Sequence, residues 1–121
     1  MSAKFDALSA VKLKRLIACK EVSPVEVTLR ALEAAQATQS SLNAFSTLMP
    51  EAALAAAVAA EDAVMRGQPL GFLHGIPVSV KDLIAVGGVT YASGSKAMAN
   101  NIAAADAPAV ERLRQAGAII I

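Results

Sequence analysis

Residues 76–82, which read Ile-Pro-Val-Ser-Val-Lys-Asp, decide the fold class of this chain. The run 76–80 is rich in β-branched residues and predicts a buried strand. Pro77 fits near its start, where a missing N–H costs least. A second apolar run, at residues 118–121, predicts another core strand after a helix. Helices that alternate with buried strands indicate an α/β fold, and we expect a mixed β-sheet covered by helices.

Capping signals predict that the first 66 residues are mainly helical. Ser23 stands at an N-cap position, Pro24 follows at N1, and Glu26 at N3 completes a capping box. Val22 and Val27 occupy the two positions of a hydrophobic staple. We expect this helix to run to about residue 39. Its apolar stripe, which should be buried, is formed by Val25, Leu29 and Leu32.

Two more helices and a short segment complete this helical part. Ser9 can cap a first helix, whose apolar stripe includes Val11, Leu13, Leu16 and Ile17. Pro50 opens an alanine-rich helix over residues 51–66, and Gly67 ends it at the C′ position. Residues 43–48, which precede the alanine-rich helix, are expected to be extended.

The remaining residues predict the lysine strand, a loop and a last helix. Glycine and serine punctuate a long irregular stretch over residues 85–104. Asp106 is expected to cap a helix over 107–116, with Pro108 in its first turn and Gly117 at its end. The chain therefore divides into a helical part (1–66), the lysine strand and loop (67–104), and a helix with the start of a strand (105–121).

The apolar run at residues 118–121 also bears on domain organisation. A core strand needs neighbours on both sides, and natural domains usually end in polar residues. We expect the chain to be the N-terminal portion of a single larger domain. The alternative is a small compact domain whose last strand closes its own sheet. An unpaired strand edge further predicts self-association or a homo-oligomer.

The composition excludes several classes of protein. With 121 residues, 55% of them hydrophobic and 17% charged, the chain can fill the core of one domain, which argues against disorder. The net charge of +1 comes without a basic block, so no nucleic-acid partner is expected. No segment offers the roughly 20 apolar residues of a membrane span, and no secretory signal opens the chain. Cys19 is the one cysteine and cannot form an internal disulfide, which favours a cytoplasmic location.

Lys81 is the candidate for chemistry, because it directly follows the predicted strand. An amine held out of water there loses its hydration and can serve as a neutral base. The alternative is a lysine that extends to solvent beside Asp82, and composition alone favours that alternative. Ser79 lies two residues earlier and faces the same way on a strand. A Ser–Lys pair can act as nucleophile and base, although the Ser-x-Lys pattern is common by chance.

The other polar residues carry weaker signals. His74 precedes Gly75 in a turn, where a capping or hydrogen-bonding role is favoured over catalysis. With one histidine and one cysteine, the chain lacks the soft ligands of a metal site. Neither the Gly-Gly pair at 87–88 nor the Ser-Gly-Ser turn at 93–95 has the spacing of a phosphate-binding loop. We expect neither a metal nor a cofactor.

Residues 69–82, PLGFLHGIPVSVKD, resemble a segment of the amidase signature family, whose members carry a similar PLxGIPVxVKD stretch. Further similarities follow the family's order along the whole chain. They lie at 21–27, 42–45, 93–95, 105–108 and 113–118. The resemblance implies an amidase-signature α/β fold. It also implies hydrolysis of small-molecule amides, or transfer of their ammonia.

Members of this family use a Ser–cis-Ser–Lys triad, and the resemblance identifies Lys81 as its lysine. It argues against Ser79 as the nucleophile, since family members often carry another residue there. Both triad serines belong to a glycine- and serine-rich segment that would follow residue 121, and neither Ser93 nor Ser95 matches it. We therefore expect this chain alone to be inactive.

Two other functions stay open at this point. Amphipathic helices often pair with another chain, so a non-catalytic interaction module is one alternative. The transfer-RNA amidotransferase subunit of the same family is the other, and the absence of a basic patch lowers its weight only slightly. The sequence does not identify the amide.

Overall fold

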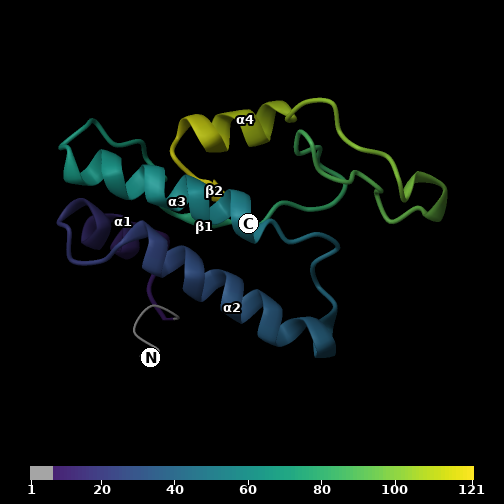
Figure 1. Cartoon of the computed structure of the whole chain (residues 1–121), viewed down its shortest axis with the longest axis horizontal. Coiled ribbons are helices and arrows are strands. Elements are labelled where there is room, and N and C mark those ends of the chain that lie inside the picture. The colour runs from purple at the N-terminus through teal and green to yellow at the C-terminus, as the bar shows by residue number, and fades with distance from the viewer. Residues whose placement is uncertain (1–6) are drawn as a thin grey trace.

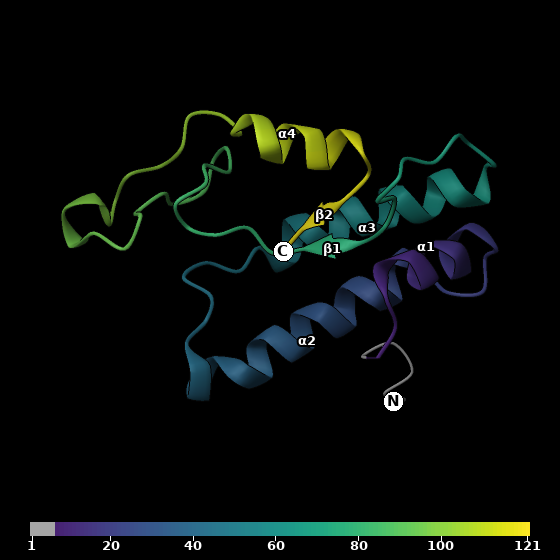
Figure 2. The same ribbon diagram turned by 180° about the vertical axis from the view of Figure 1, so that it is seen from behind.

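The computed structural model describes residues 7–121 (Figure 1). Its elements, in chain order, are α1 (Ala10–Ala18), α2 (Pro24–Leu42), α3 (Pro50–Met65), β1 (Pro77–Val78), the short 3-10 helix η1 (Lys96–Met98), α4 (Pro108–Gln115) and β2 (Ile119–Ile120). The helices expected before residue 67 are confirmed. The long loop that carries η1 extends away from the other elements, as the front and back views both show (Figures 1 and 2).

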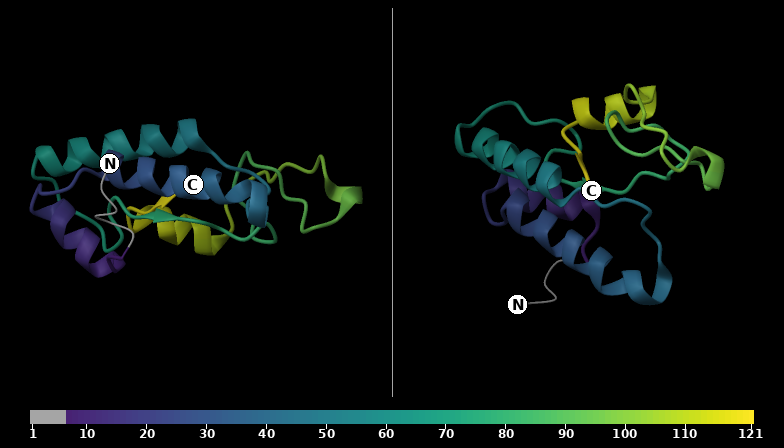
Figure 3. Two further views of the ribbon diagram at one scale, coloured as in Figure 1. Left: turned by 90° about the horizontal axis from the view of Figure 1, so that it is seen from below. Right: turned by 45° about the vertical axis from the view of Figure 1, so that its right-hand side comes forward.

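The two strands form a parallel sheet between helical layers. Pro77 is paired with Ile119, and Val78 with Ile120. Helices α2 and α3 lie on one side of the strands and α4 lies on the other (Figures 1 and 3). Ile119 and Ile121 pack into a buried cluster with α2 and α3, whereas Ile120 packs against α4, because successive side chains of a strand point to opposite faces. The expected α/β class is confirmed; both described strands are parallel, so the mixed character of the sheet stays a prediction.

Helix α2 begins where the capping signals place it. The Ser23 hydroxyl accepts hydrogen bonds from the backbone N–H groups of Val25, at 3.0 Å, and Glu26, at 3.5 Å. Val22 and Val27 lie in one buried cluster, which confirms the hydrophobic staple. The helix is longer than expected, since it reaches Leu42.

One residue of the expected α2 stripe was wrongly placed. Leu29 is 41% exposed, whereas Leu32 is buried. At 100° per residue, the buried arc of the helix is centred on the face that holds Thr28 and Ala35, and Leu29 falls outside it. The buried residues of the helix are Pro24, Val27, Thr28, Leu32 and Ala35.

The segment 43–48 forms no strand. Asn43 has a left-handed backbone conformation (φ 46°) that turns the chain away from the axis of α2. The backbone N–H of Phe45 donates to the Gln39 side-chain oxygen at 3.2 Å, and the Gln39 amide group donates to the Phe45 carbonyl. One side chain thus satisfies both backbone groups that a neighbouring strand would otherwise have to pair.

Helix α3 matches its prediction, but the start of α4 does not. Gly67 follows α3 with φ +68°, as a C′ glycine should, and Ala53, Ala57 and Ala60 bury one face of the helix. At α4 the N-cap is Ala107, without a side-chain hydrogen bond, so the prediction that Asp106 caps this helix is wrong.

Asp106 holds two distant segments instead. One carboxylate oxygen accepts from the backbone N–H of Gly87 at 2.8 Å, and the other lies 2.8 Å from the Arg114 guanidinium. The carboxylate is therefore directed toward the start of the long loop and the last turn of α4, away from the free N–H groups at the start of that helix. This double contact links the long loop to α4.

Two glycines allow the loop before β1 to lie against the end of α4. Leu73 N–H donates to the Ala116 carbonyl at 2.8 Å, and Gly75 N–H donates to the Gly117 carbonyl at 3.0 Å. A Cβ atom on Gly71 would overlap the carbonyl oxygen of Ala116, and one on Gly117 would lie 2.8 Å from the His74 Cα. Both contacts involve backbone atoms, which cannot rotate away as a side chain can.

We expect Gly71→Ala to lower the free energy of unfolding by about 1–3 kcal/mol, because overpacking against backbone forces a shift of the loop. The control is Gly67→Ala, where nothing lies within 4 Å but φ is +68°. That substitution should cost only the roughly 1–2 kcal/mol of a left-handed alanine. Urea denaturation followed by circular dichroism measures both. A Gly71→Ala cost below about 1 kcal/mol would contradict the close approach.

Candidate active site

The strand that leads to Lys81 is shorter than the 76–80 expected from the sequence. β1 spans Pro77–Val78, and its last bond to β2 runs from Ile121 N–H to the Val78 carbonyl at 3.2 Å. Beyond that bond, the side chains of Ser79 and Lys81 are exposed. The expectation that Lys81 is held out of water is therefore wrong for the described chain. The reason is that no element within residues 7–121 covers the side chain once the pairing with β2 ends.

Lys81 lies on the wall of an open hollow of about 620 Å³, here called the lysine hollow. Segment 43–47 forms one part of its lining, segment 79–82 forms another, and Ile121 completes it. Ser79 and Lys81 both line it, as expected of residues two positions apart on an extended chain. Ser46 and Thr47, which carry hydroxyl groups, line the hollow as part of segment 43–47. The hollow is large enough for a small amide and places an amine at its edge.

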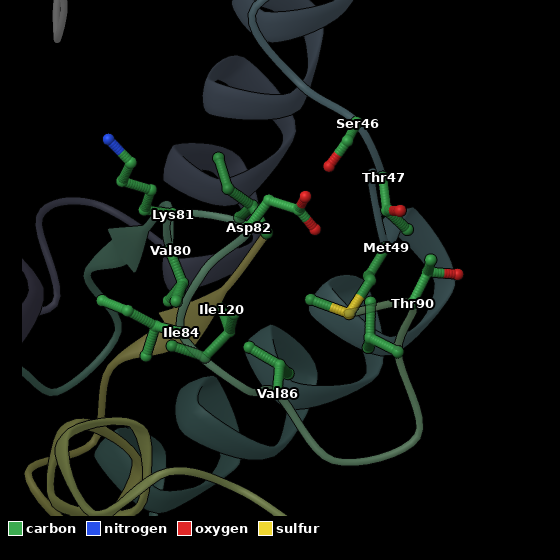
Figure 4. Close-up of a pocket in the computed structure, with 12 residues that line it drawn as sticks. Ser46, Thr47, Met49, Val80, Lys81, Asp82, Ile84, Val86, Thr90 and Ile120 are labelled. Atoms are coloured by element: carbon green, nitrogen blue, oxygen red, sulfur yellow. The ribbon is translucent and has the colours of Figure 1, made fainter. Parts of the chain in front are cut away.

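Asp82 faces away from Lys81. Figure 4 shows the lysine amine and the aspartate carboxylate pointing in opposite directions, with the carboxylate toward the side of Ser46 and Thr47. The carboxylate accepts hydrogen bonds from the backbone N–H groups of Ala92, at 3.4 Å, and Gly94, at 3.2 Å. The alternative of a lysine in solvent beside its aspartate is thus half right: the amine is exposed, but Asp82 is engaged elsewhere.

Asp82 also lines a second, smaller cavity of about 40 Å³. Figure 4 shows the residues around this smaller cavity. Val80, Ile84 and Val86 reach it from the segment that follows β1, and Ile120 reaches it from β2. Its apolar lining packs the segment around Lys81 onto the sheet and α4. The base of the lysine segment is therefore part of the core even though the lysine side chain is not.

The other predicted polar residues lie apart from the lysine hollow. His74 is half-buried, and its Nε2 lies 2.9 Å from the Ala60 carbonyl, which confirms a hydrogen-bonding role between the loop and α3. Ser93 and Ser95 are exposed on the long loop, near the two backbone amides that Asp82 binds. Cys19 is exposed and has a free thiol. Within residues 7–121, no three His, Cys, Asp or Glu side chains gather in a group that could hold a metal ion.

Asp82 is the residue whose role the sequence did not reveal. Its two hydrogen bonds reach residues 10 and 12 positions further along the chain. No periodic pattern connects positions in an irregular loop, so neither the spacing nor the residue types predicted this contact.

The chain as a whole has counterparts among known proteins. The Amidase family matches residues 26–121 of this chain. The chain belongs to the amidase family. This confirms the resemblance to amidase signature enzymes that residues 69–82 carry, and the matched range includes Lys81 and the whole lysine hollow.

Relatives of this amidase-family chain include two kinds of protein. It is 37% identical over 114 residues to a glutamyl-tRNA(Gln) amidotransferase subunit of Chloroflexus aurantiacus, a match that covers 94% of the chain and 23% of the relative. It is 39% identical over 119 residues to the putative amidase AmiD of Mycobacterium tuberculosis, covering 96% of the chain and 25% of the relative. The chain therefore spans about a quarter of the length of these curated relatives.

Solved amidase structures share the fold. A crystal structure of an amidase matches with a TM-score of 0.84 and 38% identity, over 94% of this chain and 26% of that one. The peptide amidase from Stenotrophomonas maltophilia matches with a TM-score of 0.87 and 29% identity, over 95% of this chain and 24% of the other. Among residues 7–121, no helix combines the length and apolar character that crossing a bilayer demands.

Proposed function

We propose that this amidase-family chain supplies the lysine of a Ser–cis-Ser–Lys triad to an enzyme that hydrolyses carboxylic amides. The supporting observation is the place of Lys81: it lies three residues after the end of β1, lines the lysine hollow, and falls within the residues 26–121 that the family matches. The carboxylate of its neighbour Asp82 points the other way and binds the backbone N–H groups of Ala92 and Gly94.

In this role the Lys81 amine acts as a base through a bridging serine. The neutral amine accepts the proton of the bridging hydroxyl, which in turn takes the proton of the nucleophilic serine as that serine attacks the amide carbonyl. The amine of the substrate leaves with a proton returned along the same path, and an acyl-enzyme remains. Water then attacks the acyl group and releases the carboxylic acid. Backbone N–H groups that stabilise the oxyanion lower the barriers of both steps.

The serines of this scheme are expected in a segment that follows residue 121. Curated relatives are about four times longer, since the match covers 23–25% of their length. Because Lys81 is exposed, the burial that favours a neutral amine has to come from other residues of the full-length protein. We accordingly propose that the 121-residue chain is inactive alone and that a small-molecule amide binds in the full-length enzyme.

The test is amide hydrolysis by the full-length protein and by its Lys81→Ala variant. Release of ammonia or amine from simple aliphatic and aryl amides is the readout. Turnover that depends on Lys81 supports the proposal, and turnover that survives the substitution overturns it.

A second candidate is an amidotransferase subunit that acts on glutamyl-tRNA(Gln). Several relatives at 37–42% identity are named as subunits of such an amidotransferase, which is the observation in its favour. The same lysine would then serve to release ammonia for transfer to the charged transfer RNA, and the partners would be further subunits and that RNA. Mass spectrometry of the aminoacyl-tRNA after incubation with the full-length protein, its partner subunits and an amide donor distinguishes the two. Conversion of glutamyl- to glutaminyl-tRNA would favour this candidate.

The 121-residue chain should self-associate, as would the non-catalytic interaction module considered from the sequence. Each strand of the described sheet has one edge without a strand partner, and large apolar side chains are exposed on three helices and a loop. They include Val11, Leu42, Val58, Met65 and Phe72. Sedimentation velocity at about ten to a hundred micromolar should give a mass above 12.3 kDa that rises with concentration. A constant mass of 12.3 kDa over that range would contradict the expectation.

The cytoplasmic location stays a prediction.

A further inference from the structure

Residues 88–103 form an arm whose two sides are hydrogen-bonded to each other near its base. Its two sides pair in an antiparallel manner: Gly88 N–H donates to the Ala103 carbonyl at 2.8 Å, and Ala103 N–H donates to the Val89 carbonyl at 3.0 Å. Further out, Tyr91 N–H donates to the Asn101 carbonyl at 2.7 Å. Residues 93–100 beyond this point are exposed, and the arm extends away from the helices (Figure 1).

Asp82 is the side chain that ties this arm to the lysine segment. The N–H groups of Ala92 and Gly94 converge on its carboxylate, because Ser93 and Gly94 both have left-handed backbone conformations, with φ of 50° and 72°. A turn can in this way direct two N–H groups of neighbouring residues to one anion. Hydrogen bonds to a carboxylate are stronger than those between neutral groups, so this contact holds both partners.

The same contact bears on Lys81, because the two residues share a peptide bond. After the β1–β2 pairing ends at Val78, the Lys81 carbonyl accepts a hydrogen bond from Ile84 N–H at 2.8 Å, a local turn contact that does not reach another element. A carboxylate fixed on one face of the segment obliges the lysine side chain to project from the other face, and Figure 4 shows the two side chains pointing in opposite directions. Lys81 is part of the lining of the lysine hollow in this arrangement.

We propose that Asp82 is a positioning residue for Lys81: by binding the Ala92 and Gly94 amides it locks the backbone of residues 81–82, and this fixes the direction in which the lysine side chain projects from the lining of the lysine hollow. This inference rests on the proposed function of Lys81. Asp82 touches neither substrate nor reacting atoms in this role.

The first arm of the test uses the full-length enzyme with Asp82→Ala, Asp82→Asn and the control Asp62→Ala. Asp62 is also a carboxylate, but it pairs with Arg66 on the surface of α3. For Asp82→Ala, kcat per active site should fall about 10–100-fold with KM within about twofold, because misplacing a catalytic group by an ångström costs on that order. Asp82→Asn keeps one acceptor oxygen and should fall between Asp82→Ala and wild type. The control should leave both constants unchanged.

Counting active sites by stoichiometric acylation separates lost turnover from lost folded protein. An unchanged kcat in Asp82→Ala, when Lys81→Ala is inactive, overturns this inference and leaves the proposed function standing. Activity that survives Lys81→Ala overturns the proposed function, whatever Asp82 does.

The second arm uses the 121-residue chain and remains decisive if a full-length variant fails to fold. Hydrogen exchange of the Ala92 and Gly94 amides should accelerate about tenfold in Asp82→Ala. The backbone order parameter of Lys81 should fall from the rigid value of about 0.85 toward about 0.6. Faster exchange in the arm with an unchanged order parameter at Lys81 would show that Asp82 holds only the arm, and the inference would be wrong.

Discussion

Replacing Lys81 with alanine should reduce kcat for amide hydrolysis by about 10²–10⁴-fold in the full-length protein, the usual cost of removing a general base. The fold should survive, because the side chain is exposed in the described chain and fills no part of the core. Thermal melts of wild type and variant, recorded beside the activity assay, check both halves of this expectation.

Lys81→Arg should fail as well. A guanidinium stays protonated over the working range of proteins and cannot accept a proton from the bridging serine. Two matched controls lie close in sequence. His74→Ala loses a hydrogen bond to Ala60, and Ser79→Ala loses a hydroxyl on the lysine hollow, yet both should keep much of the activity. If Lys81→Ala melts like the wild type and still turns over an amide at a near-normal rate, the lysine is structural and its proposed role is wrong.

The second large expected effect is a difference in amide hydrolysis between the 121-residue chain and the full-length protein. The chain alone should show no amide hydrolysis above the uncatalysed rate, because it holds the base without the nucleophile with which that base would work. The missing oxyanion donors would by themselves cost about 10²–10³ in rate. The measurement is product release from a chromogenic anilide, with the full-length protein assayed at the same molar concentration.

Lys81→Ala in the 121-residue chain is the control for this second expectation, and both chains should give the same background. Hydrolysis by the chain that disappears in this variant would mean that a nucleophile lies within these residues. Ser79, which lines the same hollow, would then be the first residue to replace.

Much of the fold and part of the site followed from local sequence signals. The N-caps at Ser9 and Ser23, the staple of Val22 and Val27, and the C′ glycine at 67 all appear in the structure as expected. Each such signal acts between residues a few positions apart, so the chain carries it without reference to the rest of the molecule. Family membership was likewise predictable, because residues 69–82 are contiguous.

The tertiary structure decided which side chains are covered and which polar groups meet. Leu29 is exposed because α2 packs on α3 and the sheet through a different face of the helix, the one that holds Leu32. Asp106 binds Gly87 and Arg114 rather than its own helix, and Asp82 binds amides 10 and 12 residues away. Lys81 is exposed because the pairing of β1 with β2 ends at Val78 and no described element covers the lysine side chain beyond that point.

What the sequence by itself determined is therefore the set of helices, the α/β class, the family and the identity of the candidate lysine. The tertiary structure alone decided how far β1 extends, which way Lys81 and Asp82 point, and which segments the two aspartates hold together. The physical reason is the range of the forces involved. Backbone preference and capping act within one helical turn, whereas burial and carboxylate–amide contacts depend on segments that folding alone brings into contact.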